Sequence, residues 1–149
     1  MQEQIEKDLK LAMLAGDKAK TETLRGLKNA IQNEIIRVGA KQTGISDEQM
    51  QRVLVKEAKQ RQESAYLYQK ANETERAKKE LAEKAIIETY LPEALDEDEL
   101  KVLISKHITA LRAESIADMG KVIGAVCAEA GASADGATVA RLVREALGA

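Results

Sequence analysis

Residues 24–38 read LRGLKNAIQNEIIRV, and this stretch decides the fold. Its large apolar residues recur at spacings of three or four, and they are Leu24, Leu27, Ile31, Ile35 and Val38. Side chains at these spacings lie on one face of an α-helix. The stretch therefore predicts an amphipathic helix with a continuous apolar seam.

The segment before this helix carries a similar pattern. Residues 2–15 are expected to form a first helix whose apolar face holds Ile5, Leu9, Ala12 and Met13. Gly16 can adopt the left-handed conformation that ends a helix, and Asp17 is a favourable N-cap for the next one. The first two helices are thus predicted to be joined by a short turn.

Two more helices are expected before the only proline. Ser46 and Gln49 can form a capping box that opens a third helix, and the apolar pattern weakens near residues 71–74. A fourth helix is expected to end at Tyr90-Leu91, because Pro92 disfavours helical backbone in the residue before it.

A new pattern begins after Pro92. Asp96 and Glu99 can form a second capping box, and short helices are expected at residues 96–112, 116–129 and 135–147. We therefore predict an all-α protein, with an N-terminal multi-helix domain in residues 1–92 and a C-terminal three-helix bundle in residues 93–149.

The composition excludes several classes of protein. The 149 residues are 44% apolar and 32% charged, with one cysteine (Cys127) and one histidine (His107). A disulfide framework needs cysteine pairs, and a zinc site usually needs four Cys or His ligands, so we expect neither metal nor cofactor. The sequence also lacks a secretory signal and an apolar stretch long enough to span a membrane, so we expect no contact with a membrane and a reduced, cytoplasmic location.

The net charge of −2 is unevenly distributed. Through Pro92 there are 17 Lys and Arg against 15 Asp and Glu, a net charge of +2; the remainder has 6 against 10, a net charge of −4. Neither part has the strong basic excess of a protein that binds nucleic acid mainly through phosphates. Charge alone is therefore not expected to hold this chain on RNA.

No catalytic residue is assigned from the sequence. Cys127 and His107 could form a nucleophilic pair, but a free cysteine more often packs as a small buried hydrophobe. The sequence has neither a nucleophile elbow nor a glycine-rich phosphate loop. The acidic clusters at residues 47–48 and 96–99 fall at expected helix starts, where carboxylates complement the helix dipole.

The third expected helix carries basic residues on one side. Arg52, Lys56 and Lys59 follow one another at spacings of four and three. Arg61 lies near the apolar seam of the same helix, and Arg25 lies at the edge of the seam of the second helix, so each must reach water or meet a partner. A solvated charged face is the alternative interpretation.

Two glycine-containing segments stand out after Pro92. Gly120 and Gly124 lie in an expected helix, where each costs about 1 kcal/mol relative to alanine. Such a cost suggests close backbone approach by a ligand or by another helix. Asp135-Gly136 lies at the next helix start, where backbone amides favour an anion, although tight helix packing and a simple N-cap account for most of these two features.

The chain resembles the YqeY-like proteins, which share their fold with the tail of GatB, a subunit of the glutamine-dependent aminoacyl-tRNA amidotransferase. The resemblance runs nearly end to end and rests on five segments: Leu24-Arg25 with Leu27 and Ile31, Lys59-Gln60-Arg61, Tyr90-Leu91-Pro92, Asp118-Met119-Gly120-Lys121-Val122 with Gly124, and Asp135-Gly136. It implies an all-α fold and a link to tRNA, or to a tRNA-charging enzyme. The family's association with carbon–nitrogen ligase activity, with glutamine as amido donor, implies no complete enzyme here, because the amidase motif is missing.

From this resemblance our leading hypothesis is a non-catalytic adaptor that binds tRNA by shape. The residues expected to contact tRNA or a partner are Arg25, Lys56, Lys59, Arg61, Asp118, Gly120, Lys121, Gly124, Asp135 and Gly136. The alternatives are a protein–protein interaction module and a component of a glutamine-dependent amidotransferase that acts in trans. Tyr66 and Tyr68 lie two residues apart on an expected helix and so face different directions, which leaves no surface on which bases could stack. We therefore do not expect the protein to recognise individual RNA bases.

Overall fold

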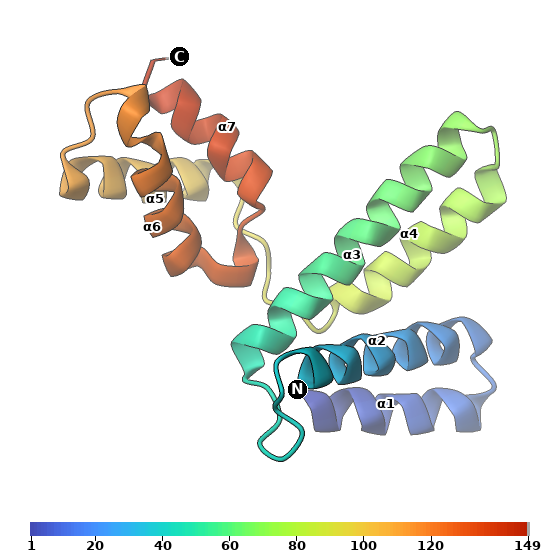
Figure 1. Ribbon diagram of the computed structural model, residues 1–149. Coiled ribbons are helices and arrows are strands. Elements are labelled where there is room, and N and C mark those ends of the chain that lie inside the picture. The colour runs from blue at the N-terminus through green and yellow to red at the C-terminus, as the bar shows by residue number, and fades with distance from the viewer. Residues whose placement is uncertain (149) are drawn as a thin grey trace. The chain divides into compact units, whose positions relative to one another are not determined.

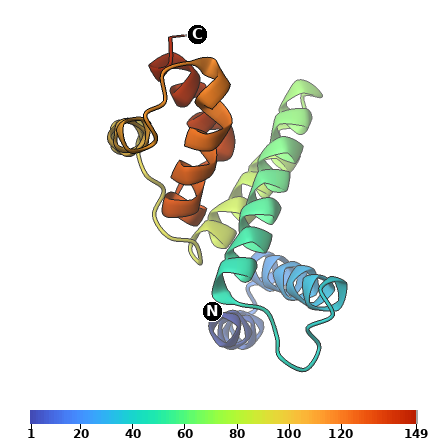
Figure 2. The same ribbon diagram turned by 60° about the vertical axis from the view of Figure 1, so that its left-hand side comes forward.

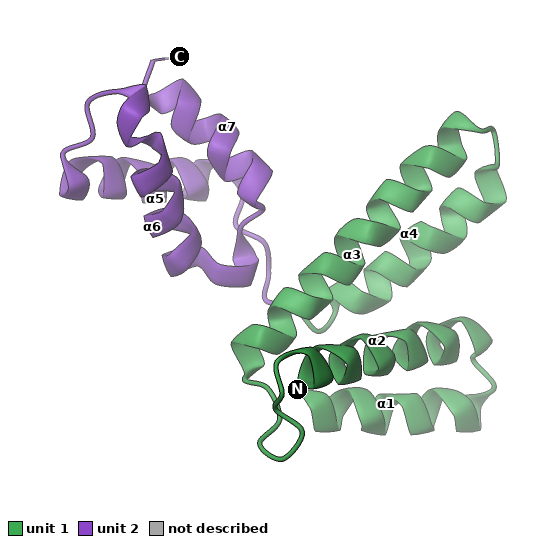
Figure 3. Cartoon of the chain, in the orientation of Figure 1, with its two compact units in different colours: residues 1–91 green, residues 92–149 purple. Residues whose placement is uncertain are grey.

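The computed structural model describes residues 1–148. These residues form seven α-helices and two short 3-10 helices and contain no strand (Figure 1), which confirms the predicted all-α class. None of the helices in this described part is long and apolar enough to cross a membrane. The chain folds as two compact units, residues 1–91 (unit 1) and residues 92–149 (unit 2), which Figure 3 shows in different colours.

Unit 1 begins with a hairpin of two helices, α1 (Gln2–Ala15) and α2 (Lys18–Arg37). The turn between them is built as the sequence predicts. Gly16 adopts a left-handed conformation with φ of 70°, and the side chain of Asp17 accepts a hydrogen bond from the backbone N–H of Lys20 at 3.0 Å.

A second, longer hairpin follows, made of α3 (Asp47–Lys70) and α4 (Thr74–Glu88). The predicted capping box is present: the backbone N–H of Gln49 donates to Ser46 Oγ, and the backbone N–H of Ser46 donates to the Gln49 side chain. The tip of this hairpin projects away from α1 and α2 within unit 1 (Figure 2).

The fourth helix ends earlier than the sequence predicts. Its last residue is Glu88, and Tyr90 lies in a turn beyond the helix. The phenol of Tyr90 donates a hydrogen bond of 2.6 Å to Asp8 Oδ2 on α1. Burial, and then the contact with Asp8, raises the pKa of the Tyr90 phenol. This bond fastens the end of α4 to the first helix.

The core of unit 1 confirms most of the predicted seam. Leu24, Leu27, Ile31 and Ile35 are buried together with residues of the other three helices, namely Ile5, Met50, Leu54, Ala58 and Ile87. Two predicted core residues are exposed: Val38, which caps α2, is 38% exposed, and Met13, which follows the buried Ala12, is 52% exposed. The apolar pattern of the sequence therefore extends beyond the buried seam.

Unit 2 contains α5 (Glu97–Leu111), α6 (Met119–Ala130) and α7 (Gly136–Ala146). The capping box of Asp96 and Glu99 is formed as predicted. Residues 116–129 were expected to form one helix, but the 3-10 helix η1 (Ile116–Asp118) precedes α6, and a second one, η2 (Gly131–Ser133), follows it. The buried core is aliphatic and comprises Leu100, Ile104, Val122, Val126, Val139, Leu142 and Val143.

Candidate functional site

Three of the four basic residues predicted as contacts in unit 1 are free of ion pairs. Arg25, Lys56 and Lys59 are exposed, and within residues 1–148 no carboxylate lies within 4.0 Å of their charged groups. Nη2 of Arg25 lies 3.9 Å from the sulfur of Met13, which is a weak hydrogen-bond acceptor. These three cations can bind an anion without first releasing a carboxylate.

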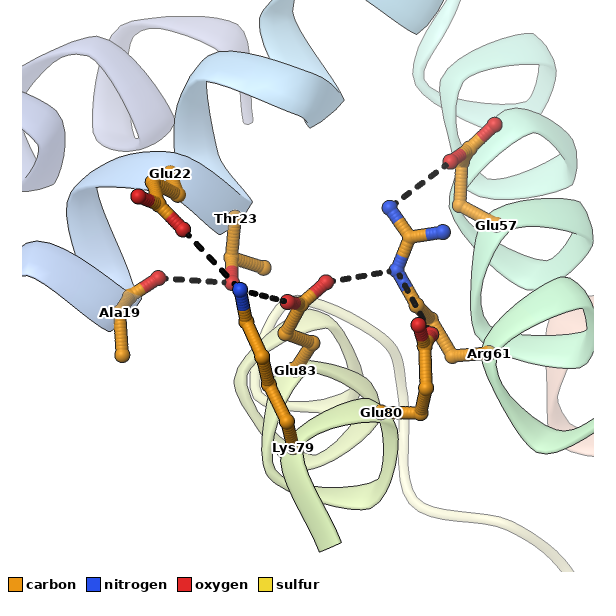
Figure 4. A network of polar contacts seen from close by, with 8 residues as sticks. All are labelled: Ala19, Glu22, Thr23, Glu57, Arg61, Lys79, Glu80 and Glu83. Carbon is orange, nitrogen blue, oxygen red and sulfur yellow. Dashed lines mark hydrogen bonds and ion pairs between the residues drawn. The ribbon is translucent and has the colours of Figure 1, made fainter. Parts of the chain in front are cut away.

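Arg61 has a different environment (Figure 4). Its Nε lies 2.9 Å from a carboxylate oxygen of Glu83 and 3.7 Å from one of Glu80, and its Nη2 lies 3.9 Å from Glu57. Only 22% of the side chain is exposed. Because three carboxylates already surround this guanidinium, we assign Arg61 to the framework that joins α3 and α4.

The acidic cluster around Arg61 continues onto α2. Lys79 lies between Glu22 at 3.3 Å and Glu83 at 3.9 Å, as Figure 4 shows. Arg61 Nε and Glu80 Oε2 are buried without a hydrogen-bond partner, so their contribution is mainly Coulombic. The network therefore places fixed charge of both signs at the junction of α2, α3 and α4.

A groove of about 370 Å³ lies between α2 and α3. On α2 its polar lining includes the amides of Asn29 and Asn33 and the guanidinium of Arg37. On α3 it includes the ammonium of Lys56. Cationic and amide groups are the ones that bind phosphate and sugar oxygens in nucleic-acid complexes. We call this feature the α2–α3 groove.

The sequence contained a signal for this groove that our interpretation missed. Arg25, Asn29, Asn33 and Arg37 follow one another at intervals of four, which places them in one row along α2. The row was not recognised because the predicted contacts of unit 1 were all basic residues, and the two asparagines carry no charge. Sequence reasoning therefore found Arg25 and Lys56 but neither asparagine.

Two carboxylates, those of Glu34 and Glu57, line the groove and limit its positive charge. Glu34 accepts two hydrogen bonds from Arg37, 2.7 Å from Nε and 2.6 Å from Nη2. The hydrogen bonds with Arg37 lower the pKa of the Glu34 carboxyl, and they raise the pKa of Arg37 in return. Arg37 is thus engaged in a bidentate pair, and only part of its guanidinium is free for a ligand.

The predicted acidic residues of unit 2 serve as caps. Asp118 Oδ2 accepts hydrogen bonds from the backbone N–H groups of Glu114 and Ser115 at 3.2 and 3.4 Å, and these bonds, that with Glu114 first, lower the pKa of its carboxyl. Asp135 caps α7 by accepting from the N–H and the hydroxyl of Thr138 at 2.9 and 3.0 Å. Both carboxylates thus hold helix starts in place.

The predicted glycines of unit 2 face open space. A Cβ atom added at Gly120, Gly124 or Gly136 would have no neighbouring atom within 4 Å in the part of the chain that the structure describes. Packing within residues 1–148 therefore does not explain these glycines. Next to Gly120, Lys121 is 76% exposed and lies 3.9 Å from Asp118.

Cys127 and His107 have separate surroundings. His107 Nε2 lies 2.8 Å from a carboxylate oxygen of Glu129, and the other oxygen of Glu129 accepts a hydrogen bond from Lys106 at 2.7 Å. Partial burial, with a smaller effect from the negative charge of Asp135, raises the pKa of the Cys127 thiol. A raised pKa disfavours the thiolate that a nucleophile needs. Within residues 1–148 no three His, Cys, Asp or Glu side chains are grouped to hold a metal ion.

A family model described as Yqey-like protein matches residues 2–147, nearly the whole chain. No curated protein matches the sequence significantly.

Proposed function

Because the chain belongs to the Yqey-like protein family, we propose that it is a helical adaptor, without catalytic activity of its own, that binds folded RNA and in particular tRNA. The observation that carries this proposal is the α2–α3 groove, which is lined by Lys56 on α3 and by Asn29, Asn33 and Arg37 on α2. The resemblance to the GatB tail supports tRNA as the ligand.

The groove suits a phosphodiester backbone. Lys56 supplies a cation that has no carboxylate within 4.0 Å in residues 1–148, although Glu34 and Glu57 also line the groove, and Asn29 and Asn33 can donate to phosphate or ribose oxygens. Arg25 lies one helical turn before Asn29 in the same row. Contacts of this kind fix the position of an RNA without reading its sequence.

Unit 2 would add a second contact surface. Lys121 is exposed, and the backbone beside it at Gly120 and Gly124 is open to close approach. A glycine lets a ligand approach the helix backbone more closely than a side chain would allow. We therefore include Lys121, Gly120 and Gly124 among the proposed RNA contacts and assign Asp118 and Asp135 to helix capping.

We expect the wild-type protein to bind bulk tRNA at low salt and to lose affinity as salt rises. With about four phosphates neutralised, the slope of log affinity against log salt concentration should be about −3. Fluorescence anisotropy of labelled tRNA measures both quantities. Absence of binding at low salt would overturn the proposal, and capture of a protein from nuclease-treated lysate would then favour the interaction module.

Replacing Glu34 by glutamine should strengthen tRNA binding. The substitution removes the charge that occupies Arg37, so the guanidinium becomes free for a phosphate. We expect the affinity for tRNA to increase about three- to fivefold. The slope of log affinity against log salt concentration should become more negative by up to about one unit. The matched control is Glu3→Gln on α1, which removes the same charge from an exposed position outside the groove. Equal gains in both variants would show that only net charge matters.

A further inference from the structure

One face of α3 carries an ordered series of exposed polar side chains. The spacings along this face are four, three, four, three and four, and its members are Arg52, Lys56, Lys59, Glu63, Tyr66 and Lys70. Residues at these spacings share one side of a helix. From Arg52 to Lys70 the series spans 18 residue steps, which corresponds to about 27 Å along the helix axis. We call it the α3 track.

The α3 track carries charges of both signs in a defined order. Three cations begin it, a carboxylate and a phenol follow, and the cation Lys70 ends it. Lys70 Nζ lies 4.6 Å from the centre of the Tyr66 ring. Glu63 follows Lys59 by four residues, yet within residues 1–148 no cation lies within 4.0 Å of the Glu63 carboxylate. Glu63 is therefore a free acceptor in a cationic surface.

An exposed carboxylate is an unfavourable neighbour for a continuous row of phosphates. The cations before it, ending at Lys59, and the cation after it, Lys70, are separated by about 16 Å along the helix. A ligand that fits this order has negative charge at two places and hydrogen-bond donors between them. The minor groove of an RNA duplex has this pattern, because two phosphate rows flank a wide, shallow surface of 2′-hydroxyl groups.

We infer that the RNA held at the α2–α3 groove is a double-stranded arm whose minor groove lies across the α3 track. Arg52, Lys56 and Lys59 contact the phosphates of one strand, and Lys70 contacts those of the other strand. Between them Glu63 accepts a hydrogen bond from a 2′-hydroxyl, and the Tyr66 phenol lies beside it. This inference rests on the proposed function, and it adds the form of RNA that is bound and a means of distinguishing RNA from DNA.

Two features of the α3 track support a duplex over a single strand. Its cations form two groups about 16 Å apart along the helix, which matches the two phosphate rows that flank a groove and not the single row of one strand. Its single aromatic ring, Tyr66, already has a lysine over its face, and single-strand binders use several rings to stack successive bases. Recognition through phosphates and 2′-hydroxyls reads the shape of the duplex and not its base sequence.

The test compares an RNA hairpin of about ten base pairs with a DNA hairpin of the same sequence. Wild type should bind the RNA hairpin more tightly. Glu63→Met removes the acceptor and keeps the length of the side chain, so it should weaken binding of RNA about fivefold and leave binding of DNA unchanged or stronger. Glu63→Gln keeps an acceptor oxygen and should retain the preference for RNA.

The sign of the effect separates this inference from simple repulsion. If Glu63 faces phosphates, Glu63→Met and Glu63→Gln will both strengthen binding of RNA and DNA alike, and the inference is overturned. Glu3→Met on α1 provides the control for loss of one negative charge. A wild type that binds RNA and DNA equally would overturn this inference alone, whereas a wild type that binds neither nucleic acid would overturn the proposed function.

Discussion

Replacing Arg61 by methionine should lower the free energy of unfolding of unit 1 by about 2–3 kcal/mol. Methionine keeps most of the packing of the arginine stem but removes the guanidinium that lies among Glu57, Glu80 and Glu83, whereas Lys79, 3.9 Å from Glu83, remains. Removing one partner of a buried pair typically costs about 3–5 kcal/mol, and the partial exposure of these side chains reduces that figure.

Urea unfolding followed by circular dichroism measures this loss. Arg76→Met is the matched control, because Arg76 makes an exposed pair with Glu73 at 3.8 Å on the same hairpin. Exposed pairs contribute about 0–1 kcal/mol, so the control should unfold close to wild type. An Arg61→Met variant as stable as this control would show that the guanidinium is dispensable to the fold.

A double-mutant cycle identifies the source of the loss. Adding Glu83→Gln to Arg61→Met removes the carboxylate that lies nearest the lost guanidinium, so the double variant should be more stable than Arg61→Met alone. We expect a coupling of about 1 kcal/mol or more between the two positions, since they lie 2.9 Å apart. If the effects of the two substitutions on the free energy of unfolding are additive, the lost stability comes from packing and not from the ion pair.

Reversing the charge of Lys56 and Lys59 together should reduce affinity for tRNA by more than about tenfold. The double substitution Lys56→Glu, Lys59→Glu removes two proposed phosphate contacts and adds two carboxylates beside Glu63. The slope of log affinity against log salt concentration should become less negative by about two units, one for each contact that is lost. Anisotropy of labelled tRNA over a salt series gives both results.

The matched control reverses two lysines elsewhere in unit 1. Lys7 and Lys10 on α1 are exposed, and within residues 1–148 neither lies within 4.0 Å of a carboxylate, so Lys7→Glu, Lys10→Glu makes the same change in net charge. This control should bind tRNA nearly as well as wild type. Equal losses in the two double variants would locate the affinity in net charge and contradict the role of the groove.

The local features of the fold could be predicted from the sequence. The capping boxes at Ser46 and Asp96 involve residues only three apart, so their geometry depends on the helix start alone. The seam of Leu24, Leu27 and Ile31 was also predictable, because helical periodicity places these side chains on one face.

Features that depend on packing could not be predicted from the sequence. The partners of Arg61 on α4 lie 19 and 22 residues further along the chain, and only the register of the α3–α4 hairpin brings Glu80 and Glu83 to it. The α2–α3 groove likewise needs two helices in contact, so the row formed by Asn29 and Asn33 gave no sign of a site on its own. A Cβ atom at Gly120 would meet no atom within 4 Å in the described residues, so no other helix of residues 1–148 makes the close approach that this glycine suggests.

The placement of the aromatic residues gives this protein an optical label on one unit. Tyr66, Tyr68 and Tyr90 all belong to unit 1, and residues 92–149 contain neither tyrosine, phenylalanine nor tryptophan. Intrinsic ultraviolet fluorescence therefore reports on unit 1 alone, whereas the amide signal reports on the helices of both units. Recording the two signals during one titration will show whether the units unfold together or in turn, without any dye, tag or truncated chain.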